Sequence, residues 1–160
     1  MNLGLLIGSF SSGTWATTAS HQSNLYPSPY SPYSASGAVD AYLSYGVPPE
    51  KIYIGVPFYS RGFEGTDGLG KPATGPSPDK SWEPGVVDYK ELPLAGAVEM
   101  WDDAAQAGYS YDAARKVMNT YDVPQAVKAK CEYINQKGLG GLIIWESTVH
   151  DCWLLILRLW

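Results

Sequence analysis

Residues 51–56 have the sequence KIYIGV, and this short run decides the class of fold. Its apolar residues follow one another too closely for one face to meet water, which is typical of a parallel strand covered on both faces. Gly46, Pro48 and Pro49 lie just before the run and predict the end of a helix there. A helix followed by a buried parallel strand indicates an α/β protein.

The residues before the strand predict this helix and a loop that leads into it. Ser36 is the predicted N-cap, and Val39, Tyr42 and Leu43 fall on one helical face. Residues 17–36 are rich in Ser, Pro and Tyr and follow neither a period of two nor one of 3.6. They predict an irregular loop.

The amino-acid composition changes after the strand. From Pro57 to Tyr121 the chain is rich in Gly and Pro, with turn signals at residues 67–68, 84–85 and 95–96. We expect a small α+β insertion in this stretch. A second helix is then predicted from Asp122 as N-cap to Gly138, with a buried stripe made by Ala126, Val127, Cys131 and Ile134.

A second short apolar strand is predicted at residues 139–145 (LGGLIIW). The order is therefore helix, strand, long insertion, helix and strand, which gives two βα-type units. A complete (β/α)8 barrel needs about 250 residues. The 160 residues of this chain are thus predicted to be the last part of a larger domain.

Composition narrows the function. With 45% hydrophobic and 17% charged residues the chain is typical of folded proteins. A net charge of -5 and a pI near 4.9 disfavour nucleic acid and anionic membranes as partners, and no apolar run approaches the roughly 18 residues of a membrane span. The chain has 12 Tyr and 6 Trp but only 3 Phe, and aromatic rings with polar tips favour a partly solvent-exposed cleft for an amphipathic ligand such as a sugar. Cys131 and Cys152 are predicted to be free thiols.

Five segments, in this order, carry a specific resemblance to a known family: IYIGVPFYSRGFEG (52–65), SWEPGVVDYKEL (81–92), YSYD (109–112), YDVPQAV (121–127) and GLGGLIIWE (138–146). Together they resemble the C-terminal part of a family-18 glycoside hydrolase of the fungal chitinase type. The resemblance implies a partial TIM barrel in which residues 51–58 form the seventh strand and residues 142–145 the eighth. It divides the chain into partial barrel (1–59), insertion domain (60–120), last barrel helix and strand (121–147) and a tail outside the family pattern (148–160).

The resemblance also implies a substrate-binding wall. Trp145 is similar to the tryptophan beneath the family's −1 sugar, Arg61 to an arginine that reaches the sugar, and Glu83 to a carboxylate of the insertion domain. Tyr59 and Trp82 are further candidates. The alternative for Trp145 is a core tryptophan, that for Arg61 is a surface ion pair, and that for Glu83 is a solvated surface charge. No cofactor or metal is expected, because adjacent residues such as His150, Asp151 and Cys152 cannot all turn to one ion.

The catalytic motifs of the resembled family do not occur in this sequence. The family's substrate-assisted mechanism uses a glutamic acid in a DxxDxDxE motif, and no such spacing is found here. Ser9 and Phe10 stand where the MxYD motif would place Tyr and Asp. We therefore expect no catalytic residue in this chain, which is predicted to be part of a chitinase acting on chitin or N-acetylglucosamine oligosaccharides.

The family resemblance also bears on the location of the protein, and two alternative functions remain open. The resemblance implies an extracellular protein, although the N-terminus has no Lys or Arg before its apolar stretch and so no evident signal peptide. The alternatives are a non-catalytic chitin-binding protein and the non-functional product of a truncated gene.

Overall fold

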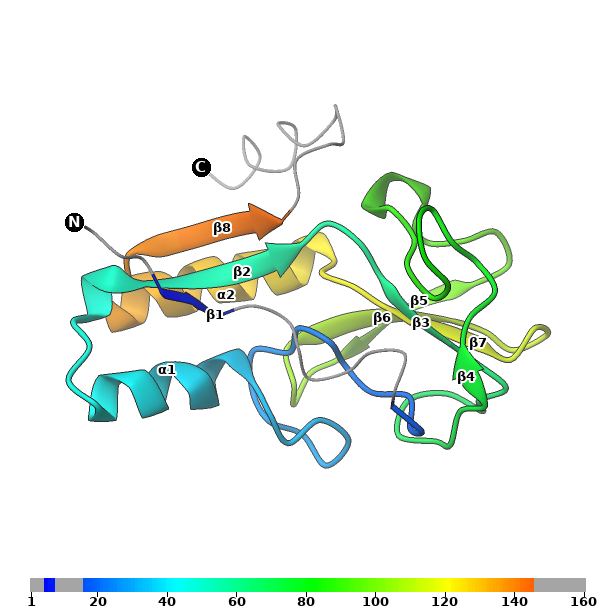
Figure 1. The fold of residues 1–160 in the computed structure, drawn as a ribbon, viewed down its shortest axis with the longest axis horizontal. Coiled ribbons are helices and arrows are strands. Elements are labelled where there is room, and N and C mark those ends of the chain that lie inside the picture. The colour runs from blue at the N-terminus through cyan, green and yellow to red at the C-terminus, as the bar shows by residue number, and fades with distance from the viewer. Residues whose placement is uncertain (1–4, 8–15, 146–160) are drawn as a thin grey trace.

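The computed structural model describes residues 5–7 and 16–145. A three-stranded parallel sheet forms one half of the structure, with β1 (Leu5–Ile7), β2 (Ile52–Pro57) and β8 (Gly141–Trp145) in the order β1-β2-β8 (Figure 1). Strands β2 and β8 pair in parallel from Tyr53 opposite Gly141 to Pro57 opposite Trp145. The predicted parallel strand is confirmed by its pairing with β1 and β8. Ile52, Ile54 and Val56, which share one face, are fully buried, and Tyr53 on the other face is half-buried.

Two helices pack on this sheet. Helix α1 (Ala35–Ser44) leads through the 3-10 helix η1 (Pro49–Lys51) into β2, and α2 (Pro124–Lys137) leads into β8. Val39 of α1 and Ile134 of α2 join Ile52 and Ile54 in one core cluster. Gly138 ends α2 with a left-handed φ of 64°, as its sequence position predicts.

Both predicted N-caps are wrong. Ser34 caps α1, because its extended backbone lets the hydroxyl accept a hydrogen bond from the Gly37 amide at 3.1 Å, whereas Ser36 is buried inside the helix. Val123 stands at the N-cap position of α2 without a side-chain cap. Asp122, the expected cap, is instead buried in an ion pair with Lys130.

A five-stranded antiparallel sheet forms the other half, in the order β4-β3-β7-β6-β5. Its strands are β3 (Arg61–Glu64), β4 (Gly75–Pro76), β5 (Val98–Asp102), β6 (Ala107–Asp112) and β7 (Val117–Thr120). We expected helix as well as strand here. Residues 60–120, all of which are described, hold the 3-10 helix η2 (Tyr89–Glu91) but no α-helix, because the frequent Gly and Pro turns leave only short segments that pair as strands.

The loop at residues 16–34 lies between the two halves and has no helix or extended strand, as predicted. It is hydrogen bonded to the antiparallel sheet side through Tyr26, whose amide donates to the Ala105 carbonyl at 3.0 Å. Leu25 of the same loop belongs to the core cluster of the helices and β2. The loop therefore joins the parallel half to the antiparallel half.

Some predictions concern residues outside those described. They are the ones for Ser9, Phe10, Cys152 and the tail at 148–160. Within the described residues Cys131 is a free cysteine, half-buried on α2. No helix in the described part of the chain is long and apolar enough to cross a membrane.

Candidate substrate-binding site

The candidate site forms where the chain leaves β2. The Phe58 amide donates to the Trp145 carbonyl at 2.8 Å, and the Ser60 amide donates to the Val87 carbonyl at 2.8 Å. Two residues later the Gly62 amide donates to the Gly85 carbonyl at 2.7 Å. The segment after β2 is thus hydrogen bonded on one side to the end of β8 and then to the loop at residues 81–88, which brings distant parts of the sequence together.

A tight turn gives this loop its shape. The Val86 amide donates to the Glu83 carbonyl at 3.0 Å, and the Ser81 amide donates to the Val86 carbonyl at 2.7 Å. Gly85 has a φ of 79°, and a Cβ atom at this position would lie 3.0 Å from the Gly62 carbonyl oxygen. Glycine is therefore required both for the backbone conformation and for the close approach.

Arg61 and Glu83 are brought together by this arrangement. Arg61 Nη1 donates to Glu83 Oε1 at 2.6 Å, a short charge-assisted hydrogen bond. Glu83 is half-exposed and Arg61 is mostly buried. The surface ion pair that we weighed for Arg61 is therefore present, and it holds two of the predicted binding residues in one place.

Tyr59 and Trp82 extend this cluster. The Arg61 guanidinium carbon lies 5.5 Å from the centre of the Tyr59 ring, within the range of a cation–π contact. The Tyr59 and Trp82 rings meet edge to face with centres 5.8 Å apart. Trp82 Nε1 donates to Asp88 Oδ1 at 3.3 Å, and the indole is still 56% exposed. We call these four residues, Tyr59, Arg61, Trp82 and Glu83, the aromatic–arginine cluster.

Trp145 lies at the neighbouring strand end. It pairs with Pro57 in the register of β2 and β8, two residues before Tyr59, and its side chain is 59% exposed. Among the described residues its indole makes no ring contact or hydrogen bond with the aromatic–arginine cluster. Glu146, which follows it, is outside the described residues.

The side chains of this site combine hydrogen-bonding groups with flat apolar faces. Arg61 supplies donors, Glu83 supplies acceptors, and the exposed indoles offer flat apolar faces. Among the residues that the structure describes there is no group of three or more His, Cys, Asp or Glu that could hold a metal ion.

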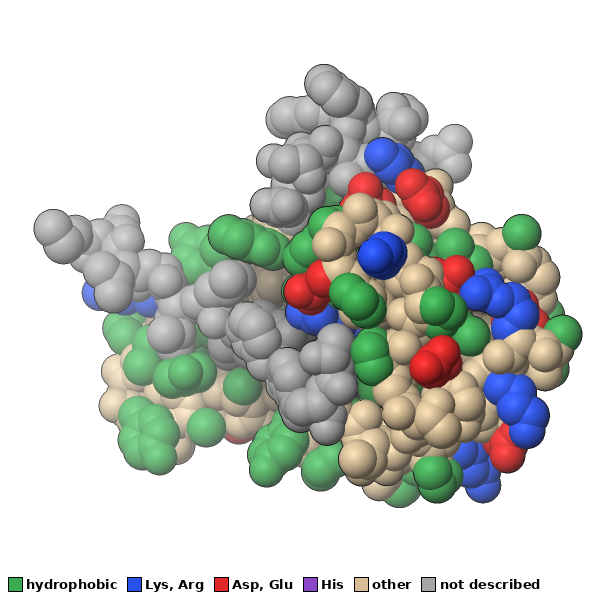
Figure 2. Space-filling view, turned by 45° about the vertical axis from the view of Figure 1, so that its right-hand side comes forward, with side chains coloured by type: hydrophobic (Ala, Val, Ile, Leu, Met, Phe, Trp, Pro, Cys, Tyr) green, Lys and Arg blue, Asp and Glu red, His purple; other side chains and the backbone are tan. Residues whose placement is uncertain are grey.

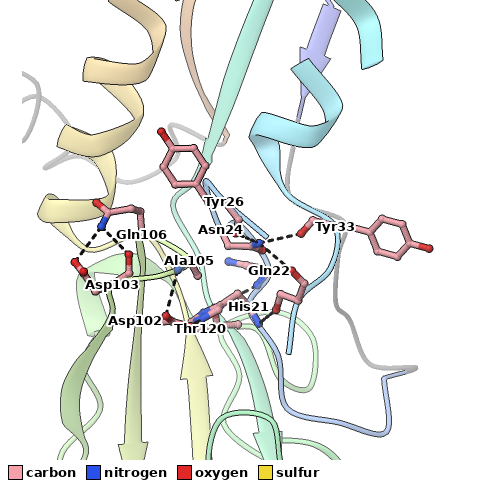
Figure 3. A network of polar contacts seen from close by, with 11 residues as sticks. His21, Gln22, Asn24, Tyr26, Tyr33, Asp102, Asp103, Ala105, Gln106 and Thr120 are labelled. Carbon is pink, nitrogen blue, oxygen red and sulfur yellow. Dashed lines mark hydrogen bonds and ion pairs between the residues drawn. The ribbon is translucent and has the colours of Figure 1, made fainter. Parts of the chain in front are cut away.

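A buried polar network around His21 was not predicted (Figure 3). His21, fully buried, lies with Nε2 3.1 Å from Asp102 Oδ2. Burial lowers the pKa of His21, and the hydrogen bond to Asp102 partly offsets this. Gln22 reaches the candidate site directly, since its Nε2 donates to the Tyr59 carbonyl at 2.8 Å. The loop at residues 16–34 therefore positions the backbone of the site.

Lys130 and Asp122 form a second buried contact. The Lys130 ammonium donates to Asp122 Oδ2 and to the Ser23 hydroxyl, and the Ser23 hydroxyl donates to Asp122 Oδ2 at 3.1 Å. Burial raises the pKa of Asp122, while the charge of Lys130 works against this rise. A sequence signal existed: Lys130 lies midway between Ala126 and Ile134 at helical spacing, so it falls on the predicted apolar stripe.

Comparisons with known proteins show the family to which this chain is similar. The family model "Glycosyl hydrolases family 18" matches residues 6–149. Endochitinase 1 of Metarhizium robertsii is 43% identical over 141 residues, which are 86% of this chain and 33% of that protein. The chain thus spans about a third of the length of this curated relative.

Two solved structures are similar in fold. The catalytic domain of the psychrophilic chitinase B from Arthrobacter TAD20 superimposes with a TM-score of 0.84 at 32% identity, covering 95% of this chain and 36% of that one. A chitinase from Cycas revoluta in complex with (GlcNAc)3 gives a TM-score of 0.82 at 26% identity, covering 98% and 45%. From the family match over most of its residues, the chain belongs to glycosyl hydrolase family 18.

Proposed function

We propose that this chain provides one wall of the substrate-binding cleft of a chitin-hydrolysing glycosidase. The observation that carries the proposal is the aromatic–arginine cluster: segments 59–61 and 82–83, separate in the sequence, converge beside the end of β8. The structural relative from Cycas revoluta was solved with (GlcNAc)3. We propose chitin and N-acetylglucosamine oligosaccharides as the ligands here too.

The positions of the strands support a cleft at this place. We propose that β2 and β8 are the seventh and eighth strands of a (β/α)8 barrel and that residues 60–120 are its insertion domain. Active sites of such barrels lie at the carboxyl ends of the strands. Tyr59 and Arg61 follow the carboxyl end of β2, and Trp145 ends β8. All three therefore lie at the end of the sheet where a barrel binds its substrate.

Each residue has a role that fits its exposure. Trp145 and Trp82 stack on the apolar faces of sugar rings, Arg61 donates hydrogen bonds to sugar or acetamido oxygens, and Glu83 accepts them from hydroxyls. The Tyr59 ring contacts the Arg61 guanidinium and helps to hold it in place. The face drawn in Figure 2 has acidic and basic side chains interspersed.

The chemistry would be shared with residues that this sequence does not contain. In the substrate-assisted route the acetamido group of the substrate attacks its own anomeric carbon while a glutamic acid protonates the leaving oxygen. We propose that this chain binds and orients the sugar and that it does not supply the proton. We further propose an extracellular location, on the grounds of the family alone.

Binding without hydrolysis is the second candidate function. It is favoured by the absence of a DxxDxDxE spacing from a sequence that retains the aromatic–arginine cluster. In this case the chain would hold chitin and leave it intact.

One experiment tests the proposal in this chain. The purified 160-residue protein is applied to chitin beads, and free chitotetraose is used to compete. We expect retention that chitotetraose reverses, with no release of N-acetylglucosamine above buffer, because a missing proton donor removes a factor of about 10² to 10⁴ in rate. Equal retention on cellulose beads would contradict the binding wall, and turnover by the pure protein would contradict the absence of the acid.

A further inference from the structure

A pocket lies away from the aromatic–arginine cluster, between the outer strand of the antiparallel sheet and the start of α2. It is lined by Glu99, Met100 and Trp101 of β5 and by residues 123–125, and its volume is about 330 Å³. Strand β5 is three strand spacings from β3, which carries Arg61, and this corresponds to roughly 14 Å. The pocket is therefore distinct from the candidate cleft.

The floor and walls of the pocket combine apolar and polar groups. Trp101 packs against the cluster of Tyr121, Val123 and Ala126, so its indole is anchored, and Trp101 Nε1 donates to Asp103 Oδ1 at 3.3 Å. Met100 neighbours Trp101 along β5 and is 43% exposed, but its side chain points to the opposite face of the strand. The anchored indole therefore provides the flat apolar surface that can accept a sugar ring.

Glu99 supplies a fixed acceptor. Its Oε2 accepts a hydrogen bond from the Tyr121 hydroxyl at 2.9 Å. Burial and the neighbouring carboxylate raise the pKa of Tyr121, so that hydroxyl stays protonated and continues to donate. Glu99 is exposed, so its carboxylate can accept a further hydrogen bond from a ligand. Gln125, exposed in the first turn of α2, adds an amide with both donor and acceptor.

We infer that this pocket is a second carbohydrate-binding site, one that takes a single N-acetylhexosamine residue of an oligosaccharide. Its volume is at the small end of ligand sites, which fits one sugar ring. The ring's apolar face lies on Trp101, a hydroxyl donates to Glu99, and the acetamido group meets Gln125. The carboxylate disfavours anionic ligands. The inference rests on the proposed function for its class of ligand, but it concerns separate residues.

Nuclear magnetic resonance of the indole N–H groups tests this inference in the full chain. The signals of Trp101 and Trp82 are assigned from the resonance lost in Trp101→Phe and in Trp82→Phe, and chitotriose is the titrant. We expect a saturable shift of the Trp101 signal. Glu99→Gln keeps an acceptor for Tyr121 but removes the charge, and it should weaken the binding seen at Trp101 about fivefold.

Matched variants separate this site from the cleft. Val98→Ala changes an exposed residue of β5 outside the pocket and should leave the Trp101 titration unchanged. Arg61→Lys alters the cleft and should also leave it unchanged. A Trp101 signal that stays still, or one whose shift is lost with Arg61→Lys, overturns the second site. A still Trp82 signal with a moving Trp101 signal instead contradicts the proposed cleft and leaves the second site supported.

Discussion

Lys130, a basic residue, lies in the protein interior with 1% of its side chain exposed. Its ammonium is satisfied by Asp122 and Ser23, which come from the end of the antiparallel sheet and from the loop at residues 16–34. A buried ion pair is a weak source of net stability while both partners are present. Removing one partner leaves the other charge buried without compensation.

Substitution of Lys130 should therefore be costly. We expect Lys130→Met to lower the free energy of unfolding by about 3–5 kcal/mol, because Asp122 is left as a buried carboxylate. Urea denaturation measures the loss. Lys128→Met is the matched control, since Lys128 is exposed on the same helix and its pair with Glu132 at 3.9 Å contributes little. Equal stability of the two variants would show that the buried pair is not important.

His21 makes stability depend on pH. Its pKa is lowered in the folded protein, mainly by burial, whereas the unfolded chain has the ordinary value of 6.5. The unfolded state therefore binds a proton first, so the stabilisation is complete above about pH 6.5 and is lost as the pH falls below it. The groups that face the imidazole are Asp102 and the Tyr109 ring, with Asp122 farther away.

Denaturation between pH 7.5 and pH 5.5 tests this expectation. The wild type should lose stability over this interval, and His21→Gln should flatten the dependence. The chain has two histidines, so His150→Gln is the control and should retain the slope. A slope that disappears with His150→Gln instead would contradict the assignment to His21.

The residues of the candidate site could be predicted from the sequence, but their contacts could not. Arg61, Glu83, Tyr59 and Trp82 could be proposed from the sequence because they lie in continuous segments with a specific pattern. Their mutual contacts could not, since these depend on how residues 81–88 pair with the segment after β2. His21 is isolated in the sequence, and only the folded chain brings it to Asp102, 81 residues away.

At the scale of elements, local signals predicted α1, β2, α2 and β8 but not their exact ends, and they did not predict the separate strands of the antiparallel sheet. The apolar run of β2 and the helical stripe of α2 were sufficient because burial of one face repeats along the element. The caps were wrong since Ser34 and Ser36 are equally suitable by type, and only the backbone conformation decides between them. Strand order in the antiparallel sheet depends on contacts between distant residues.

The turn at Gly85 links an element to the site. Alanine there would meet the Gly62 carbonyl oxygen at 3.0 Å and would hold a left-handed φ of 79°. We expect Gly85→Ala to cost about 1–3 kcal/mol and to weaken chitotetraose binding, because Glu83 and Trp82 are displaced from Arg61 and Tyr59. Calorimetric unfolding and titration measure the two effects.

Gly68→Ala is the matched control for this turn. Gly68 also has a positive φ, of 117°, but a Cβ there meets nothing within 4 Å, and the residue lies in the loop after β3, at the opposite end of that strand from Arg61. It should reduce stability and leave sugar binding unchanged. If Gly85→Ala binds chitotetraose as well as Gly68→Ala does, the loop at residues 81–88 does not shape the site.

At the scale of the whole molecule, a parallel half and an antiparallel half meet at the end of β2. The chain passes from β2 into β3 through residues 58–60, and the loop at residues 16–34 contacts both halves. The Gln22 backbone amide donates to Thr120 Oγ1 of β7 at 3.3 Å. Ser23 accepts a hydrogen bond from Lys130 of α2, and Leu25 packs in the core cluster with β2. Changes in this loop should therefore alter the position of the site without touching the sugar. The two halves together form the wall that we propose.

The central claim is that the exposed aromatic residues at this junction bind N-acetylglucosamine oligosaccharides. Isothermal titration of chitotetraose into the wild type, Trp82→Ala, Trp145→Ala and Val98→Ala tests it most directly, with circular dichroism to check folding. We expect each tryptophan variant to bind about tenfold more weakly, a loss of roughly 1.4 kcal/mol of stacking, and Val98→Ala to match the wild type. Unchanged affinity in both folded tryptophan variants would contradict the account.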